Sequence, residues 1–265
     1  MKNSISLLSV FIALCFIVGC KSNKDRNDSG EWKLVWEENF DTGVLDETVW
    51  SKIPRGESDW NNYMSSADTL FDVRDGYLIL RGIINPDRSV DTVPYLTGGV
   101  YTKDKKAFGN GKIEIRAKFD DVKGAWPAFW LLPFVYEEWP QGGEIDIMER
   151  LNSDTIAYQT IHSYYTKVLG LKDNPPHYAV GKINNGEFNT YSVELHKDSL
   201  VFAINGNHTF TYPRIETDKE GQFPFDKEFY LMLDMQLEGA WVGKADPNDL
   251  PDIMEIDWVR FYQKE

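Results

Sequence analysis

Alternating apolar and polar residues predict β-strands along most of the chain. Residues 112–119 alternate strictly between apolar and charged side chains, and residues 191–195 repeat the alternation. Residues 200–212 alternate on both sides of Asn205-Gly206, a dipeptide typical of a two-residue hairpin turn. Because a period of two places every second side chain on the same face, these segments are predicted to be half-buried antiparallel strands.

Two later segments extend this pattern toward the C-terminus. Residues 229–237 place apolar side chains on one face of a long predicted strand, and the other face carries Asp234, Gln236 and Glu238. Residues 256–262 form a last alternating segment. Gly, Pro, Asn and Asp separate these runs, and no stretch carries an apolar helical stripe longer than about two turns. The predicted fold class is therefore all-β, with two packed antiparallel sheets.

The first 19 residues have the pattern of a targeting segment. Lys2 supplies a positive charge, and the apolar run at 7–18 is too short to span a bilayer. The run ends in Ile17-Val18-Gly19-Cys20, which resembles a bacterial lipobox and implies lipidation of Cys20. The alternative is an ordinary secretory signal with an incidental cysteine.

Residues 20–30 are polar and charged, which predicts a flexible tether, and residues 31–265 are then one domain. A lipid anchor would place this domain outside the cytoplasm at the outer membrane, on either its surface or its periplasmic face. Cys15 and Cys20 are the two cysteines of the chain. We therefore expect no disulfide, cysteine nucleophile or cysteine-ligated zinc in the mature domain.

The composition restricts the class of partner. A net charge of −14, from 28 Lys and Arg against 42 Asp and Glu, argues against nucleic acid, whose phosphates are neutralised by basic residues. Aromatic residues make up 14% of the chain, with nine Trp, which argues against disorder. Flat rings with a polar edge pack against sugar rings as well as in cores. We expect a monomer that meets the membrane only through its lipid anchor.

The segment Gly-Gly-Glu-Ile-Asp-Ile-Met-Glu-Arg at 142–150 is the most informative for chemistry. Strand alternation places Glu144 and Asp146 on one face. Neighbouring carboxyl groups raise each other's pKa, so that one can stay protonated while another is ionised. That arrangement suits an acid–base catalyst, whereas the alternative is a solvated acidic strand.

Glu149 breaks the alternation, because five residues separate it from Glu144. Strict alternation would direct the Glu149 side chain into the core, where a carboxyl group without a partner is costly. One extra residue near Ile147-Met148 would return Glu149 to the face of Glu144. We therefore predict a β-bulge at this place.

Residues 144–149 resemble the E-x-D-x-x-E signature of glycoside hydrolase family 16, in the bulged form of its laminarinase-like and agarase-like branch. Similarity to the family extends over residues 32–262. It includes three tracts, at residues 34–41, 125–133 and 255–262. The resemblance implies a β-jelly-roll sandwich with a concave substrate cleft, and retaining, endo-acting hydrolysis of β-linked glycans.

The resemblance also implies roles for individual residues. Glu144 would be the nucleophile and Glu149 the general acid/base, and Asp146 would lie between them and hydrogen-bond the nucleophile. His162 would lie near the acid/base. No cofactor would be required, although many relatives hold a structural calcium ion on the convex side, for which Asp257 is a candidate ligand.

Further candidates for substrate binding come from position and residue type, with core packing as the alternative for the Trp residues. The candidates for substrate binding are Trp126, Trp130, Trp139, His162, Gln236, Glu238, Trp241 and Asn62. The remaining histidines, His177, His196 and His208, have no metal-ligand spacing and are given no role.

Two tracts depart from the laminarinase-like pattern. Residues 58–65 stand where such relatives usually carry Asn-Glu-x-Gln-Tyr, and residues 236–239 replace a small Gly-Gly pair. Both places would contact sugars, and a site built for one hydroxyl geometry rejects its epimer. We therefore favour β-galactosidic linkages, as in poly-N-acetyllactosamine and mucin-type O-glycans. An endo-β-1,3-glucanase or mixed-linkage β-glucanase remains the alternative, and a sugar-binding lectin-like sandwich the non-enzymatic one.

Overall fold

The computed structural model describes residues 30–265. The predictions for the targeting segment, for lipidation at Cys20 and for nearly all of the tether lie outside the described residues. Glu31–Glu265 is one compact unit. Within the described part of the chain, no helix combines the length and apolar character needed to cross a membrane.

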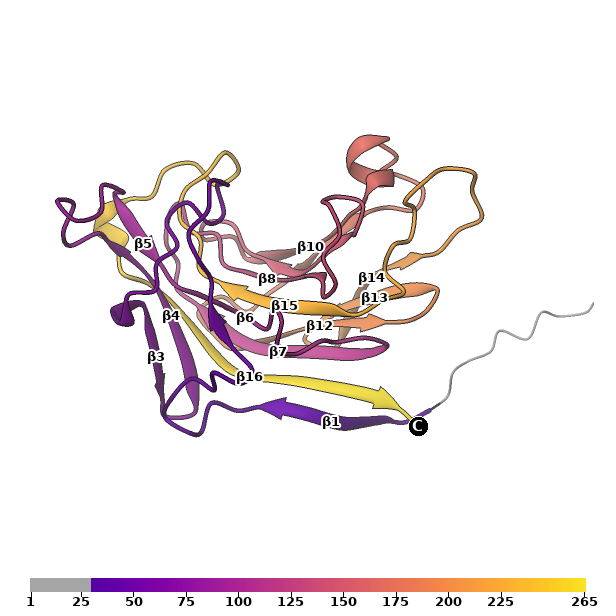
Figure 1. Ribbon diagram of the computed structural model, residues 1–265, viewed down its shortest axis with the longest axis horizontal. Helices are drawn as coiled ribbons and strands as arrows, with labels where there is room; N and C mark the ends of the chain where they lie inside the picture. Colours follow the sequence, from indigo (N-terminus) through magenta and orange to yellow (C-terminus); the bar gives the residue numbers. More distant parts are fainter. Residues whose placement is uncertain (1–29) are drawn as a thin grey trace, which may run out of the picture. The chain divides into compact units, whose positions relative to one another are not determined.

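Two antiparallel sheets make up this unit, which confirms the predicted all-β class (Figure 1). The larger sheet contains β1 (Trp32–Glu38), β3 (Phe71–Arg74), β4 (Tyr77–Ile84), β5 (Tyr95–Thr97), β7 (Gly111–Phe119), β12 (Asn189–Leu195), β13 (Ser199–Ile204), β14 (Asn207–Pro213) and β16 (Asp252–Lys264). The smaller sheet follows the order β11 (Tyr178–Lys182), β10 (Ile156–His162), β9 (Glu144–Glu149), β8 (Ala128–Pro133), β15 (Phe229–Asp234), β6 (Gly99–Tyr101) and β2 (Ser51–Lys52).

The last strand, β16, organises the larger sheet. One edge of β16 pairs with β7. The other edge pairs with β4 near the start of β16 and with β1 near its end. One large apolar core receives side chains from both sheets, including Ile113 and Val259 from the larger and Leu131 and Ile145 from the smaller. The opposite face of the smaller sheet is left free of the core and forms the floor of a cleft.

The hydrophobic pattern predicted several of these strands in detail. In β7, buried and partly exposed side chains alternate along all nine residues. The β13–β14 hairpin turns at Asn205 and Gly206, whose φ angles of 51° and 74° are those that a tight primed turn requires. Both features follow from local chemistry that is visible in the sequence.

The predicted strand at 229–237 is too long. Regular pairing ends at Asp234, where β15 ends. Beyond it, Met235 donates its backbone N–H to the Gly98 carbonyl, and Leu237 pairs singly with Ala125. The alternation continues because these residues are buried in two different clusters, and not because the strand continues.

Among residues 30–265, the short helical segments are η1 (Asp68–Leu70), η2 (Tyr164–Val168) and η3 (Pro247–Asp249). The coil at the upper right of Figure 1 is η2, which follows β10. Its first turn is held by Ser163 and Thr166, each side chain paired with the other's backbone N–H. This segment forms part of one wall of the cleft.

Candidate active site

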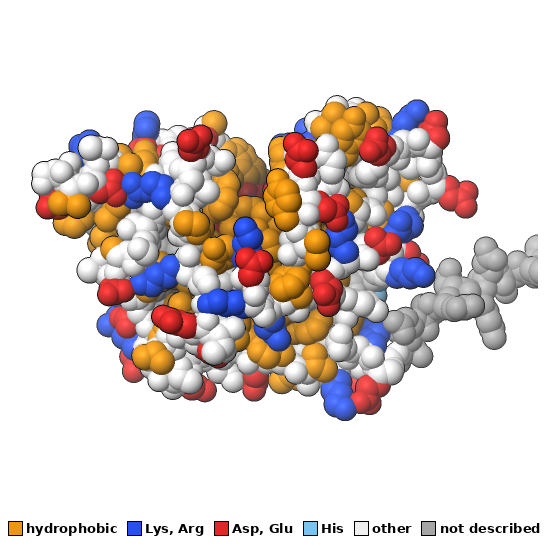
Figure 2. All heavy atoms as spheres, in the orientation of Figure 1, with side chains coloured by type: hydrophobic (Ala, Val, Ile, Leu, Met, Phe, Trp, Pro, Cys, Tyr) orange, Lys and Arg blue, Asp and Glu red, His pale blue; other side chains and the backbone are white. Residues whose placement is uncertain are grey.

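A cleft with a volume of about 920 Å³ lies on the free face of the smaller sheet. Figure 2 shows the molecule hollowed between two raised walls, with hydrophobic side chains inside the hollow. Every second residue of three adjacent strands contributes to its floor, as the period of two requires. These residues are Ala128, Trp130 and Leu132 from β8, Glu144 and Asp146 from β9, and Tyr158, Thr160 and His162 from β10.

The predicted bulge in β9 is confirmed. On β8, Trp130 pairs with Asp146 and Ala128 pairs with Glu149, so that β9 contains one residue more than its neighbour over the same span. The pairing of β9 with β10 shifts at the same place. Ile147 is the extra residue, and Glu149 consequently lies on the cleft face together with Glu144 and Asp146.

Two buried side chains hold this bulge in place from behind and from its end. Gln159 of β10 is fully buried and donates its amide N–H to the Ile147 carbonyl, 2.8 Å away. Arg150, only 1% exposed, donates to the carbonyls of Asp154 and Asp120 at 2.9 and 2.6 Å. The carbonyl freed by the bulge is therefore paired, and the strand end beside Glu149 is fixed to two loops.

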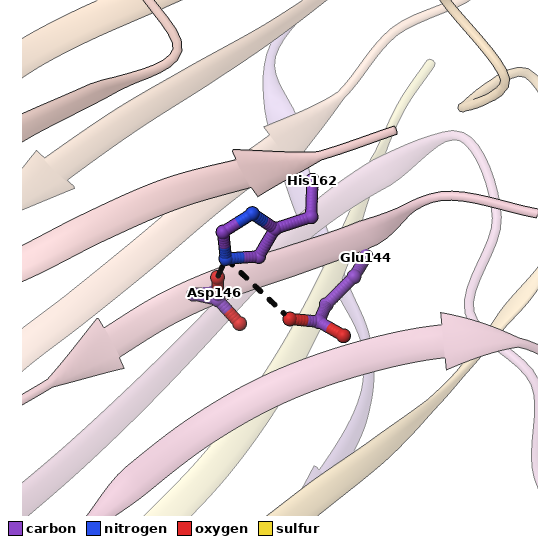
Figure 3. Close-up of side chains that lie close together, drawn as sticks. All are labelled: Glu144, Asp146 and His162. Carbon is purple, nitrogen blue, oxygen red and sulfur yellow. Dashed lines mark ion pairs between the residues drawn. The ribbon is translucent and has the colours of Figure 1, made fainter. Parts of the chain in front are cut away.

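His162 faces the carboxyl groups of Glu144 and Asp146 from the neighbouring strand (Figure 3). Its Nε2 atom lies 3.4 Å from Asp146 Oδ2 and 3.7 Å from Glu144 Oε1. Asp146 Oδ2 is a buried atom without a hydrogen-bond partner. The polar group that faces this oxygen is the imidazole of His162.

Burial raises the pKa of all three carboxyl groups. For Glu144 it raises the pKa to about 7, although the Trp139 N–H and the Lys167 charge act in the opposite direction. For Glu149 it raises the pKa to about 8, with Glu144 adding to the effect. Burial and the two neighbouring glutamates hold the pKa of Asp146 well above its usual range.

Two Trp side chains bind one glutamate each. Trp139, in the loop before β9 and half exposed, donates its Nε1–H to Glu144 Oε2 at 2.8 Å. Trp126 donates its Nε1–H to Glu149 Oε1 at 2.9 Å. Each indole therefore orients a carboxyl group while its ring lines the cleft. Trp241, also about half exposed, packs edge-on against Trp126 with ring centroids 5.6 Å apart.

His162 is neutral near neutral pH, because burial lowers the pKa of its imidazole to about 3 and the Lys167 charge adds to this effect. Lys167, on η2, is the one Lys or Arg among the described residues that line the cleft. Its ammonium lies 5.4 Å from the centroid of the Trp139 ring. The cleft therefore combines three carboxyl groups, a neutral imidazole and a single cation.

A fourth carboxyl group lies beneath the cleft. Asp234 is fully buried and accepts hydrogen bonds from Trp130 Nε1 at 2.7 Å and from Gln236 Nε2 at 2.8 Å. Burial raises its pKa to about 7. Gln236 lines the cleft as predicted, and Trp130 is both a cleft residue and a buried one.

Two predicted binding residues are placed elsewhere. Glu238 does not line the cleft, because it is buried against Tyr63 and Lys244, to which it is hydrogen-bonded. The backbone φ of Glu238, 64°, turns the chain away from the alternation on which the prediction relied. Asn62 also lies outside the cleft lining.

The calcium-ligand candidate Asp257 forms an ion pair with Arg116 of β7. It is not part of the single group of potential metal ligands found among residues 30–265, which consists of Glu144, Asp146 and His162. The structure thus gives Asp257 the role of an ion-pair partner between β16 and β7.

Several residues that line the cleft were not predicted from the sequence. Trp60 comes from the tract that departs from the laminarinase-like pattern, and its ring lies edge-on to Trp130 with centroids 4.8 Å apart. His177 lines the cleft although it was given no role, as do Lys167 and Tyr178. The aromatic character of Trp60 was a usable signal, whereas the positions of the other three depend on how η2 and the following loop fold.

Buried carboxyl groups with raised pKa values, two of them oriented by indole N–H groups, can donate and accept protons near neutral pH. The surrounding aromatic rings provide flat surfaces for sugars. The cleft volume lies at the upper end of the range for ligand sites, roughly 300–1,000 Å³. The arrangement can therefore perform acid-assisted nucleophilic displacement on an oligosaccharide.

Comparisons with known proteins agree with this geometry. The chain is 34% identical over 237 residues to a keratan-sulfate endo-1,4-beta-galactosidase of Sphingobacterium multivorum, covering 88% of this chain and 56% of that protein. The chain thus spans little more than half the length of this relative. A solved structure of a non-specific endo-beta-1,3(4)-glucanase, SCLam, has a TM-score of 0.78 at 28% identity, covering 88% of this chain and 92% of that one.

Another solved structure comes from work on endo-acting O-glycanases of the human gut microbiota that initiate mucin breakdown. It has a TM-score of 0.78 at 28% identity and covers 88% of this chain and all of that one. The profile of "Glycosyl hydrolases family 16" matches residues 81–260, which include β9 and its bulge. This chain therefore belongs to glycosyl hydrolase family 16.

Proposed function

We propose that this protein is a retaining, endo-acting β-glycoside hydrolase. The observation that carries the proposal is the bulged β9, which presents Glu144, Asp146 and Glu149 on the floor of an open, aromatic-lined cleft. Three neighbouring acids on one strand, two of them buried and Glu144 partly buried, destabilise a fold, and a purely sugar-binding sandwich would not need them.

The roles follow from the surroundings of each glutamate. Glu149 stands at the acid/base position of the family motif, and burial raises its pKa to about 8, so it can carry the proton that the departing glycosidic oxygen takes. Glu144, which accepts a hydrogen bond from Trp139, attacks the anomeric carbon and forms a glycosyl ester as the bond to that oxygen breaks. Glu149 then takes a proton from water, whose oxygen displaces Glu144 and releases a sugar of unchanged anomeric configuration. NMR of the first product formed would show the β-anomer before mutarotation, and an initial α-anomer would contradict the proposal.

For the substrate we propose glycans with β-galactosidic linkages, including poly-N-acetyllactosamine and mucin-type O-glycans. Trp60 and Gln236 support this proposal, since both line the cleft and both come from tracts that depart from the laminarinase-like pattern. The relative from Sphingobacterium is named an endo-β-galactosidase, and one structural neighbour comes from work on O-glycanases.

An endo-β-1,3-glucanase or mixed-linkage glucanase is the second candidate. It is favoured by the structural likeness to the SCLam glucanase and by a beta-glucanase of Rhodothermus marinus that is 29% identical over 99% of this chain. The buried position of Glu238 also removes one argument against it, because no acidic side chain at that position obstructs a glucan groove.

Product analysis separates the two candidates. The purified protein is incubated with laminarin, mixed-linkage glucan, agarose, keratan and mucin O-glycans, and the released oligosaccharides are identified by mass spectrometry. We expect internal cleavage of galactose-containing chains, because Gln236 and Trp60 change the surface that a glucan would contact. Release of oligosaccharides from laminarin alone would overturn the galactosidase proposal, and no release from any glycan would overturn the hydrolase proposal.

Replacing Lys167 by Met should move the activity profile to higher pH. The Lys167 charge lowers the pKa of both Glu144 and Glu149, so that its removal raises both. Activity requires Glu144 to be ionised and Glu149 to be protonated, so the pH must lie above the pKa of Glu144 and below that of Glu149. Both limbs of the kcat/KM profile therefore shift to higher pH together. Lys167→Arg keeps the charge and should retain the wild-type profile. A profile of the Met variant that stays in place or moves down would contradict this electrostatic role.

A further inference from the structure

The group formed by Glu144, Asp146 and His162 has a geometry that acid catalysis alone does not explain. One ligand atom from each residue lies within 4.8 Å of the other two. His162 Nε2 is 3.4 Å from Asp146 Oδ2 and 3.7 Å from Glu144 Oε1, as the dashed lines in Figure 3 mark. The second oxygen of Glu144 is bound by Trp139, so Oε1 is the oxygen left to face the imidazole.

The two separations that involve His162 Nε2 are close to those between ligands of a tetrahedral metal ion. Two ligand atoms that are each about 2.1 Å from a zinc ion lie about 3.4 Å apart at the tetrahedral angle. The three atoms lie within 4.8 Å of one another, so side-chain movement could bring all of them to this spacing around a small ion. All three ligand residues line the cleft, so water from the cleft could complete the coordination.

A second observation points to an absent partner at this place. Asp146 is 3% exposed, and its Oδ2 is buried without a hydrogen-bond partner. Leaving such an oxygen unpaired is unfavourable, and a cation would satisfy it. One imidazole and two carboxylates are a ligand set that suits zinc, whereas calcium and magnesium prefer oxygen ligands alone.

We propose that Glu144, Asp146 and His162 bind a divalent zinc ion reversibly, and that the bound ion blocks the cleft. The metal would occupy the oxygen with which Glu144 attacks the sugar, so it would compete with substrate. His162 Nδ1 is buried without a partner, so the ring lacks the outer support of a structural zinc site, and binding should be weaker than in such sites. The inhibition rests on the proposed function, whereas the binding does not.

Zinc titration of the whole protein, followed by isothermal calorimetry, tests the binding directly. We expect one ion per chain, and titration with cobalt(II) should show the strong visible absorption of tetrahedral coordination. Asp146→Asn and His162→Leu should each weaken binding at least about 10-fold, the lower bound for loss of even an outer-shell partner. Lys167→Met should tighten binding, because it removes the cation that lines the same cleft.

His177→Gln is the matched control, since His177 lines the cleft but lies outside the ligand group. This variant should bind zinc as the wild type does, and calcium and magnesium should not compete. Circular dichroism confirms that each variant is folded. Absence of saturable zinc binding by the wild type, or unchanged binding by His162→Leu, would overturn the proposal. Binding without competition against oligosaccharide would overturn the blocking role.

Discussion

Glu144→Gln is expected to lower kcat/KM by at least about 10⁴-fold, because an amide cannot form the glycosyl ester. The shape of the side chain and its hydrogen bond from the Trp139 indole can both be retained, since an amide oxygen accepts as a carboxylate does. Affinity for an oligosaccharide should therefore change little. Reducing-sugar assays measure the rate, and calorimetry with an uncleaved oligosaccharide measures the affinity.

The same substitution should raise the melting temperature above neutral pH. The pKa of Glu144 is raised in the folded state to about 7, from an ordinary value of 4.5. Folded protein therefore binds more protons than unfolded protein between these values, and this group makes stability fall as the pH rises through them. A Gln at position 144 does not titrate, so this pH-dependent fall in stability is removed. A variant that is inactive and less stable would point to misfolding, and a variant with full activity would show that Glu144 is not the nucleophile.

Glu149→Gln should show a loss that depends on the leaving group. General acid catalysis contributes about 10²–10⁴-fold, so cleavage of a natural glycan, whose leaving oxygen needs a proton, should fall by this factor. An aryl glycoside with a good leaving group needs no such proton, and its first step should proceed at nearly the wild-type rate. Hydrolysis of the ester then becomes slow, so a burst of released aryl alcohol is expected.

Stopped-flow absorbance with the aryl glycoside measures this burst, and Glu144→Gln is the control that should show none. The pH profile of Glu149→Gln should also lose its high-pH limb, which the Glu149 pKa of about 8 sets. Equal losses on natural and aryl substrates would show that Glu149 does not act as the acid.

The fold class and the face occupied by the acids could be predicted because both depend on local periodicity. Strand alternation identified β7 and the β13–β14 hairpin, and a conflict within that alternation predicted the bulge before Glu149. A buried carboxyl group on the core side would have been too costly, so one spacing was enough to require an extra residue.

The rest of the site depends on contacts between distant parts of the chain. Glu238 was predicted to face the cleft because it continues an alternation, yet regular pairing ends four residues earlier. Trp60 enters the cleft from a loop that precedes β8 by more than 60 residues, where no periodic pattern applies. Lys167 depends on η2, a single turn whose orientation is set by Ser163 and Thr166.

The buried amide of Gln159 has a consequence for how such sequences can change. If Ile147 were deleted, the spacing from Glu144 to Glu149 would fall to four residues, and strict alternation would keep Glu149 on the cleft face. The Gln159 amide, however, would lose the Ile147 carbonyl to which it donates at 2.8 Å. If Gln159 became apolar first, the Ile147 carbonyl would remain buried and unpaired. Each single step therefore removes a buried hydrogen bond, and a buried polar group left without any partner costs roughly 1–3 kcal/mol. Conversion of this bulged strand into one without the extra residue would therefore cost least if both positions changed together.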